Sequence, residues 1–467
     1  MGRTFQRKLE TNSQILLCKY LTRMGLGLGI SITAMILHLY NLFFTFFLFL
    51  YVPSILLRSL FQKHLRRLVA HRLGSIPDLS GKSPVWIHAA SVGEVICSIP
   101  LFKRIKKDFP DLPILLTTMT QTGNTTARTL LPEAEGFLFF PFDHPLVIRR
   151  AIRRIKPCLL LIAETELWPN LLRFCGKGNI PVLLFNGRIS QKSLKGYLSF
   201  RSLFKEGLKS IALFLMQTEE DRTRIIRIGA PPDRTRVIGN LKFDHAFPPV
   251  TPEEQKGMLN AIGLHGEETL LIAGSTHAGE EEILIRLFKK LKAEVPNLFL
   301  ILAPRHLNRL EEVEKLLKIE GLPWIRKTAL SMDGGQAIQA RPNSPSVILL
   351  DTMGELMRLY SLGTIVFIGG SLVPVGGHNP LEPLSYKKCV LFGPYMFNFS
   401  EISKRLIEIG GAIQAEGSED LLIHLKRLLE DEKGRRETGE QGHQFLLKHR
   451  GATERTFEEI RPYLGGK

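Results

Sequence analysis

The sequence predicts an α/β protein built from two Rossmann-like domains, with a membrane-anchor helix near its N-terminus. Three observations lead to this fold class. Short apolar runs alternate with amphipathic segments from Pro84 onward, a Pro-rich segment at residues 245–252 separates the runs into two series, and residues 24–57 contain no Asp, Glu, Lys or Arg. Such alternation is typical of parallel sheets covered by helices. Two series of similar size predict two sheets that face each other across a cleft.

The uncharged segment at residues 24–57 predicts membrane attachment, because about 20 apolar residues are enough to span a bilayer. Basic residues beginning with Arg58 follow it directly, whereas a cleavable signal peptide would end in small residues. We therefore expect a retained single-pass anchor within residues 1–72, with a buried core helix as the alternative. Because 34 helical residues are longer than the bilayer core is thick, the segment must tilt, break near Pro53 or lie partly in the interface. Five basic residues precede the segment and five follow it closely, so charge alone does not set its orientation.

The net charge and the cysteine positions argue against several classes of function. The 467 residues carry a net charge of +17, and residues 1–72 hold ten basic residues against one acidic residue. Because this excess surrounds the apolar segment, it favours an anionic membrane surface over nucleic acid as the partner. The five cysteines lie far apart in the sequence, which argues against a zinc site and against a disulfide framework.

The two series of apolar runs define the expected domains, at residues 73–245 and 246–467. Strands are expected at 85–88, 114–117, 137–140, 159–163, 182–185, 213–216 and 237–238, and then at 270–273, 298–302, 347–350, 365–368 and 390–392. Terminal helices are expected at 431–463, and residues 319–346 are too long for a bare loop and predict a local insertion.

Charged side chains follow three predicted strands of the first domain. Glu94 lies where a strand passes into a helix, a place where a carboxylate is stabilised and can accept a proton from a hydroxyl. Glu164 and Glu166 follow an apolar strand, so at least one of them should face the cleft. Lys242 follows the last strand and could meet an anionic substrate. The competing interpretations are a helix cap, a solvated turn and an exposed lysine.

The second domain contains residues suited to an anionic ligand. Ser275 lies in a strand-to-helix loop whose backbone N–H groups can face an anion. Arg305 follows the next strand, and a guanidinium binds phosphate through paired hydrogen bonds. Glu355 follows a third strand, and Glu382 follows a glycine-rich segment where a carboxylate can accept hydrogen bonds from ribose hydroxyls. Ordinary loop chemistry is the alternative for the first three, and a glycine loop needed only for a tight turn is the alternative for the last.

Six motifs in this order resemble those of the 3-deoxy-D-manno-octulosonic acid (Kdo) transferases of lipopolysaccharide assembly: HAASVGE, ETELWPN, GNLKFD, APRH, MGEL and GGHNPLEP. The resemblance covers about residues 30–465. It implies a GT-B-type glycosyltransferase that moves Kdo from CMP-Kdo to a lipid A precursor, lipid IVA, with inversion and without a metal or other cofactor. It also implies an enzyme at the inner (cytoplasmic) membrane, with its catalytic domains on the cytoplasmic side.

The same resemblance implies residue roles. Glu94 would be the general base, and Glu164 and Lys242 would support the transition state. The positions implied to hold CMP are Pro304, Arg305, Met353, Gly354, Glu355, Asn379, Pro380, Leu381 and Glu382, next to the Ser275 loop. The sequence contains no D-x-D motif, the usual ligand of a metal–diphosphate pair, which agrees with a donor that has one phosphate.

Two other functions stay open from the sequence. One is a membrane-anchored GT-B transferase that uses a UDP-sugar on another lipid. The other is a membrane-tethered binding protein without catalytic activity. The sequence does not set the oligomeric state.

Overall fold

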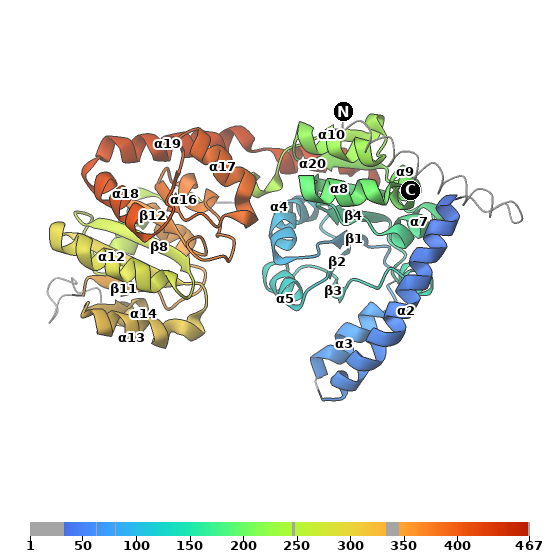
Figure 1. The fold of residues 1–467 in the computed structure, drawn as a ribbon, viewed down its shortest axis with the longest axis horizontal. Coiled ribbons are helices and arrows are strands. Elements are labelled where there is room, and N and C mark those ends of the chain that lie inside the picture. The colour runs from blue at the N-terminus through green and yellow to red at the C-terminus, as the bar shows by residue number, and fades with distance from the viewer. Residues whose placement is uncertain (1–31, 62, 80, 245–247, 333–344, 466–467) are drawn as a thin grey trace, which may run out of the picture. The chain divides into compact units, whose positions relative to one another are not determined.

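The computed structural model of the protein describes residues 32–61, 63–79, 81–244, 248–332 and 345–465. The chain divides into two compact units, Met1–His245 together with Gly451–Lys467, and Ala246–Arg450. Each unit is built on one parallel sheet of seven strands with helices packed against it (Figure 1). The predicted α/β fold with two Rossmann-like domains is confirmed.

The first unit contains a sheet in the order β3-β2-β1-β4-β5-β6-β7. Its strands are β1 (Val85–His88), β2 (Ile114–Thr118), β3 (Gly136–Phe139), β4 (Leu159–Ala163), β5 (Val182–Gly187), β6 (Leu213–Met216) and β7 (Thr235–Val237). This is the Rossmann strand order extended by one strand. The order reverses between β1 and β4, and the carboxyl ends of these two strands are where such folds bind ligands.

Two apolar cores hold this sheet between its helices. Side chains alternate across a strand, so Val85 and Ile87 contribute to one core and Trp86 to the other. Burial of both faces explains why the strands read as continuous apolar runs. The covering helices are α4 (Val92–Asp108), α5 (Gln121–Leu130), α6 (Pro145–Ile155), α7 (Pro169–Lys177), α8 (Gln191–Ser199), α9 (Arg201–Ser210), α10 (Glu219–Ile228) and α20 (Ala452–Leu464).

The second unit repeats this plan with the strand order β10-β11-β9-β8-β12-β13-β14. Its strands are β8 (Thr269–Thr276), β9 (Leu298–Pro304), β10 (Trp324–Arg326), β11 (Val347–Leu349), β12 (Ile365–Ile368), β13 (Cys389–Phe392) and β14 (Ile413–Gln414). Its helices are α11 (Pro252–Ala261), α12 (Glu280–Glu294), α13 (Leu310–Glu320), α14 (Lys327–Met332), α15 (Leu356–Leu359), α16 (Leu381–Ser385), α17 (Ser400–Glu408), α18 (Ser418–Glu430) and α19 (Glu432–His449). Here the order reverses between β8 and β12.

Every predicted strand overlaps a strand of the structure, but the edge strands β10 and β14 were not predicted. The predicted insertion at residues 319–346 contains β10 and the short helix α14. Its residues 333–344 lie outside the described residues.

The predicted second domain, residues 246–467, differs from the structure at its C-terminal end. Helix α20 packs in the first unit, where Phe457, Ile460 and Leu464 join the core that contains β1. Arg104 of α4 lies over the Phe457 ring at 3.8 Å and forms an ion pair with Glu454 at 2.7 Å. Amphipathic periodicity predicted the helix correctly, but such a pattern does not specify which sheet a helix will cover.

Helix α2 (Ile32–Phe61) contains the segment Ala34–Pro53, which is long and apolar enough to cross a membrane and has no buried residue. One face of α2 is bound to the first unit by polar contacts. Tyr40 donates a hydrogen bond to Asp143 at 3.1 Å, and Asn41 accepts one from Asn170 at 2.8 Å. The buried Asp143 carboxylate also accepts the N–H groups of Asn170 and Leu171 in α7, so it joins the two helices.

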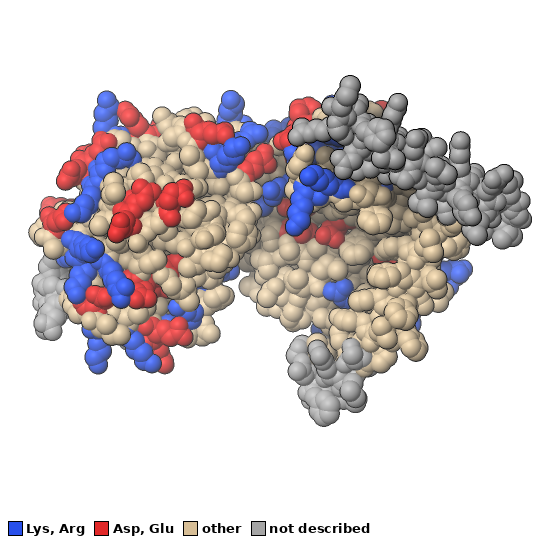
Figure 2. Space-filling model, viewed as in Figure 1, with Lys and Arg blue, Asp and Glu red and all other residues tan. Residues whose placement is uncertain are grey.

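The opposite face of α2 exposes large apolar side chains. These are Leu39, Leu42, Phe43, Phe46, Phe49 and Leu50, each more than half exposed. In the view of Figure 2, the surface along α2 carries few charged side chains. Helix α3 (Lys63–Arg72), which contacts α2, continues the chain toward β1.

The packing of α20 gives a test of the unit assignment. Replacing the fully buried Phe457 by Ala should destabilise the first unit by about 3–5 kcal/mol, because it leaves a cavity in the core. Hydrogen exchange in low urea should accelerate in peptides of β1 and β4 and stay unchanged in β8 and β12. Phe397→Ala is the control, since that ring is 54% exposed and its loss should change stability by less than about 0.5 kcal/mol. Acceleration confined to β8 and β12 would contradict the assignment of α20.

Candidate active site

Glu94 lies in the first turn of α4, directly after β1 and at the point where the first sheet reverses its strand order. Ser91 caps this helix by accepting the Glu94 N–H. In return the Glu94 carboxylate accepts the Ala90 N–H at 2.7 Å and the Ser91 hydroxyl at 3.0 Å. The carboxylate is therefore held in one position at the carboxyl end of the sheet.

The environment of Glu94 favours its neutral form. Burial raises its pKa to about 7, and the negative charges of Glu164 and Glu166 act in the same direction. The hydrogen bonds from Ala90 and Ser91 oppose this shift without cancelling it. A carboxylate with a pKa near neutrality is suited to accept and release a proton.

The structure brings Glu164 and Lys242 to the same place. Burial raises the pKa of the Cys97 thiol, which lies one turn after Glu94 on α4; Glu164 and Glu94 also raise it, and Lys242 lowers it. Glu164 follows β4 in the left-handed backbone region, with φ of 56°, a strained geometry for a residue with a side chain. The charges of the three predicted residues thus all act on the Cys97 thiol of α4.

Asn186, which the sequence did not single out, organises this group. It lies at the end of β5, is 1% exposed, and its Oδ1 accepts the N–H of Leu241 at 3.0 Å. Its Nδ2 donates to the Cys97 sulfur at 2.9 Å. Asn186 therefore fixes the short 3₁₀ helix that carries Lys242 against α4. The only sequence signal for this role was a polar residue within an apolar strand, and that signal does not show which distant residues the asparagine contacts.

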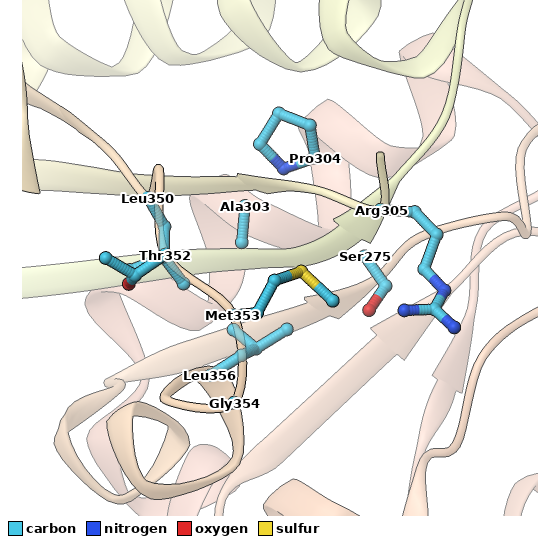
Figure 3. A pocket seen from close by; sticks show the side chains of 9 residues that line it. All are labelled: Ser275, Ala303, Pro304, Arg305, Leu350, Thr352, Met353, Gly354 and Leu356. Carbon is cyan, nitrogen blue, oxygen red and sulfur yellow. The ribbon is translucent and has the colours of Figure 1, made fainter. Parts of the chain in front are cut away.

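In the second unit a pocket lies at the carboxyl ends of β8, β9 and β11. It is lined by Ser275, Ala303, Pro304, Arg305, Leu350, Thr352, Met353, Gly354 and Leu356 (Figure 3). Five of the residues predicted to bind the donor are in this set. The Arg305 guanidinium is exposed, and no acid lies within ion-pair distance of it in the part of the chain that the structure describes. It is the cation that the pocket offers to an anion.

Glu355 and the segment Asn379–Glu382, which the sequence also predicted to bind the donor, are not among the residues that line this pocket. The Glu355 carboxylate pairs with Lys327 at 2.9 Å and accepts the Thr352 hydroxyl, so it orders the pocket wall. The side chains of Pro380 and Leu381 are buried. In this segment Asn379 and Glu382 therefore offer the polar side chains.

Glu382 interacts electrostatically with Arg305, which lines the pocket. Burial raises its pKa to about 7, whereas a hydrogen bond from Asn379 and the positive charge of Arg305 lower it. Asn379 donates this bond at 3.3 Å, and its Oδ1 accepts the Leu381 N–H at 3.1 Å. Glu382 thus lies within electrostatic range of the arginine that lines the pocket.

Glu280 is a second residue that the sequence analysis did not identify as functional. Its fully buried carboxylate accepts four backbone N–H groups, from His277, Gly370, Ser371 and Leu372, at 2.6–2.9 Å. These bonds join the loop after β8 to the glycine-rich loop after β12. The strand-to-helix loop of Ser275, which the sequence did indicate, leads into Glu280, but the role of Glu280 depends on contacts about 90 residues away in the chain.

Comparison with known proteins identifies the family. A profile described as 3-deoxy-D-manno-octulosonic-acid transferase (kdotransferase) matches residues 67–245. A 3-deoxy-D-manno-octulosonic acid transferase of Haemophilus influenzae is 35% identical over 436 residues, which cover 91% of this chain and 99% of that protein. This chain belongs to the Kdo transferase family. The Bordetella pertussis Kdo transferase is 32% identical, over 82% of this chain and 88% of its own length.

Solved structures agree with the fold of a GT-B glycosyltransferase. A glycosyltransferase from Rickettsia africae superposes with a TM-score of 0.53 at 14% identity, covering 82% of this chain and 100% of the other. A UDP-GlcNAc 2-epimerase from Neisseria meningitidis gives 0.53 at 13% identity, covering 81% and 100%. At these identities the likeness concerns the fold alone. The Kdo transferase family makes the protein a glycosyltransferase enzyme, which excludes the binding protein without catalytic activity.

The raised pKa of Glu94 predicts a pH-dependent effect on stability. Since the folded state binds a proton more tightly than the unfolded state, with a pKa of about 7 against 4.5, this residue lowers stability as the pH rises from about 4.5 to 7. Glu94→Gln removes that penalty, which is at most of the order of 3 kcal/mol. Its melting temperature relative to wild type should therefore increase between pH 5 and pH 8.

The slope with pH is the informative quantity, because the amide also changes the bonds to Ala90 and Ser91 by an amount that does not depend on pH. Glu133→Gln, at an exposed position of the same unit, is the control and should show no such slope. A pH-independent difference for Glu94→Gln would mean that the carboxylate acts only as a helix cap.

Proposed function

We propose that this Kdo transferase moves Kdo from CMP-Kdo to a lipid A precursor, lipid IVA, by an inverting reaction that uses Glu94 as general base and no metal ion. The observation that carries the proposal is the position of Glu94 at the strand-order reversal of the first sheet, with its pKa raised to about 7. The family relationship supports the choice of donor and acceptor.

The proposed chemistry is a single displacement. The acceptor hydroxyl oxygen attacks C2 of Kdo while Glu94 takes the hydroxyl proton, and the bond from C2 to the phosphate oxygen breaks with its electron pair going to CMP. Attack from the face opposite the leaving group inverts the configuration. A positioned general base typically contributes about 10²–10⁴-fold to such a reaction. Glu164 and Lys242 adjust the charge around the base and the forming bond.

The second unit is the proposed donor site. CMP carries one phosphate, whose charge the Arg305 guanidinium can offset through charge-assisted hydrogen bonds. Ser275 and the backbone of residues 353–354 line the same pocket, and Glu382 with Asn379 is proposed to accept and donate hydrogen bonds at the ribose.

Membrane attachment is proposed to occur through the exposed apolar face of α2. The sequence predicted a single-pass span, but Tyr40 and Asn41, near the middle of the apolar segment, hydrogen-bond to the globular unit. We infer that α2 inserts its apolar face into one leaflet and keeps its polar face on the protein, as interfacial helices do. The active site would then stay on the cytoplasmic side, close to a lipid-borne acceptor.

The direct test of the function is product formation. Incubation with CMP-Kdo and a tetraacylated lipid A precursor should yield a product heavier by one or more Kdo units, and CMP should inhibit more strongly than UDP. Glu94→Gln should lower turnover at saturating donor by about 10²–10⁴-fold while CMP affinity stays at the wild-type level. Stronger inhibition by UDP would favour the UDP-sugar alternative, and near-normal turnover of Glu94→Gln would transfer the role of base to Glu164.

The attachment surface can be tested by adding charge to it. The double variant Phe43→Glu, Phe46→Glu should move from the membrane pellet to the soluble fraction, because both rings are more than 60% exposed and charged groups are unfavourable in the lipid interface. Ile319→Glu is the matched control on the second unit, where the side chain is 78% exposed, and it should leave the distribution unchanged. A double variant that stays in the pellet would contradict attachment through this face.

A further inference from the structure

Two histidines lie beside Arg305 and have no role in the function proposed above. His277 follows β8, and His378 belongs to the glycine-rich loop after β12, so both occupy the strand-order reversal of the second sheet. The four hydrogen bonds to Glu280 hold their two loops together. Gly370 packs against the pair so closely that a Cβ added at this position would lie only 3.2 Å from the His378 ring.

The two rings form a hydrogen-bonded pair. Their Nε2 atoms are 2.9 Å apart, the ring centroids are 5.1 Å apart and the ring planes differ by only 9°, so the two rings lie edge to edge. The His306 ring meets His277 edge-on at 5.6 Å. A contact between two ring nitrogens requires one donor and one acceptor, so the neutral pair shares a single Nε2 proton. One outer Nδ1 then carries a proton and the other does not.

The charges around this pair favour an anion. Burial lowers the pKa of His378 to about 4, and His277, Arg305 and His306 act in the same direction. Burial also lowers the pKa of His277, with His306, Arg305 and Arg309 adding to the effect. The acids of the surrounding elements are already engaged: Glu280 by four backbone N–H groups, Glu281 by Arg309 and Glu382 by Asn379.

We propose that the His277–His378 pair is a proton-linked anion site, which takes up one proton when an anionic group of the donor binds beside Arg305. The proposal rests on the function proposed above for the identity of that donor. CMP-Kdo carries two anionic groups on one sugar carbon, the phosphate and the carboxylate, and both offer the oxygen acceptors that the site requires. The added proton converts the bare Nδ1 into a second donor, so the pair then presents two N–H groups and one positive charge.

This linkage fixes the direction of the pH effect. A bound anion raises the proton affinity of the pair, because opposite charges at short range stabilise the charged form. Binding therefore takes up protons, and affinity must fall as the pH rises. A charged hydrogen bond of this kind corresponds to about a tenfold or larger change in affinity.

The experiment is calorimetry of CMP binding to the full-length enzyme at pH 6.5, in buffers with different ionisation enthalpies. Wild type should take up a substantial fraction of one proton per CMP. His378→Asn should bind CMP about tenfold more weakly and without proton uptake. His378→Gln can keep a hydrogen bond toward His277 but cannot be protonated, so it should retain more affinity and equally lose the uptake. His424→Asn, on α18, is the matched control and should behave like wild type.

A second arm identifies the anion, using the Michaelis constant for CMP-Kdo between pH 6 and 8. Proton uptake with CMP itself assigns the phosphate to the pair. A different result assigns the sugar carboxylate to the pair. In that case CMP binds without proton uptake, but the Michaelis constant for CMP-Kdo depends on pH, and His378→Gln abolishes this pH dependence. Glu382 and the CMP phosphate, whose second pKa is about 6, are common to all these variants. The proton uptake assigned to the pair is therefore the difference between wild type and His378→Gln.

The proposal is overturned if wild type binds CMP without proton uptake and His378→Gln keeps the wild-type pH profile for CMP-Kdo. In that case Kdo transfer would still occur and the proposed function would stand. Failure of the proposed function has a different signature, namely a folded wild-type enzyme that neither binds CMP nor transfers Kdo.

Discussion

The reversal of strand order in each sheet is the constraint on which the rest of this structure depends. The segments that follow β1 and β4 turn to opposite faces of the first sheet, and those that follow β8 and β12 do the same in the second. This leaves a crevice at the carboxyl ends of the two strands in each sheet. Polar groups can occupy these places without being enclosed in an apolar core. The residues proposed for proton transfer lie at one reversal and the histidine pair lies at the other.

Buried carboxylates at the two openings show how hydrogen bonding separates a structural role from a reactive one. Glu280 accepts four backbone N–H groups, which satisfy its oxygens and make it a fixed connection between loops. Glu94 has two donors and lies near two further acids, so its charged form is poorly supported and its pKa rises to about 7. Burial is common to both residues. The number of donors and the charge of the neighbours decide which of them can exchange a proton.

Much of the fold could be predicted from the sequence because parallel strands buried on both faces are continuous apolar runs. The edge strands β10 and β14 have only three and two residues, too few to form such a run. The candidate residues Glu94, Glu164 and Lys242 follow strands directly, so their grouping could be anticipated. Asn186, Glu280 and the contact between His277 and His378 could not, since each depends on partners that are distant in sequence. For the same reason the sequence did not predict that α20 packs on the first sheet.

The return of α20 to the first unit has a consequence for biosynthesis. The second unit, Ala246–Arg450, is an insertion within the first, and the core around β1 lacks Phe457 until α20 has left the ribosome. At about 5–20 residues per second, the roughly 220 residues after His245 take on the order of 10–40 s to translate. During this interval the inserted unit can fold alone, whereas the N-terminal sheet has an open apolar face. During translation, chaperones should therefore bind mainly to the part of the first unit that precedes Ala246.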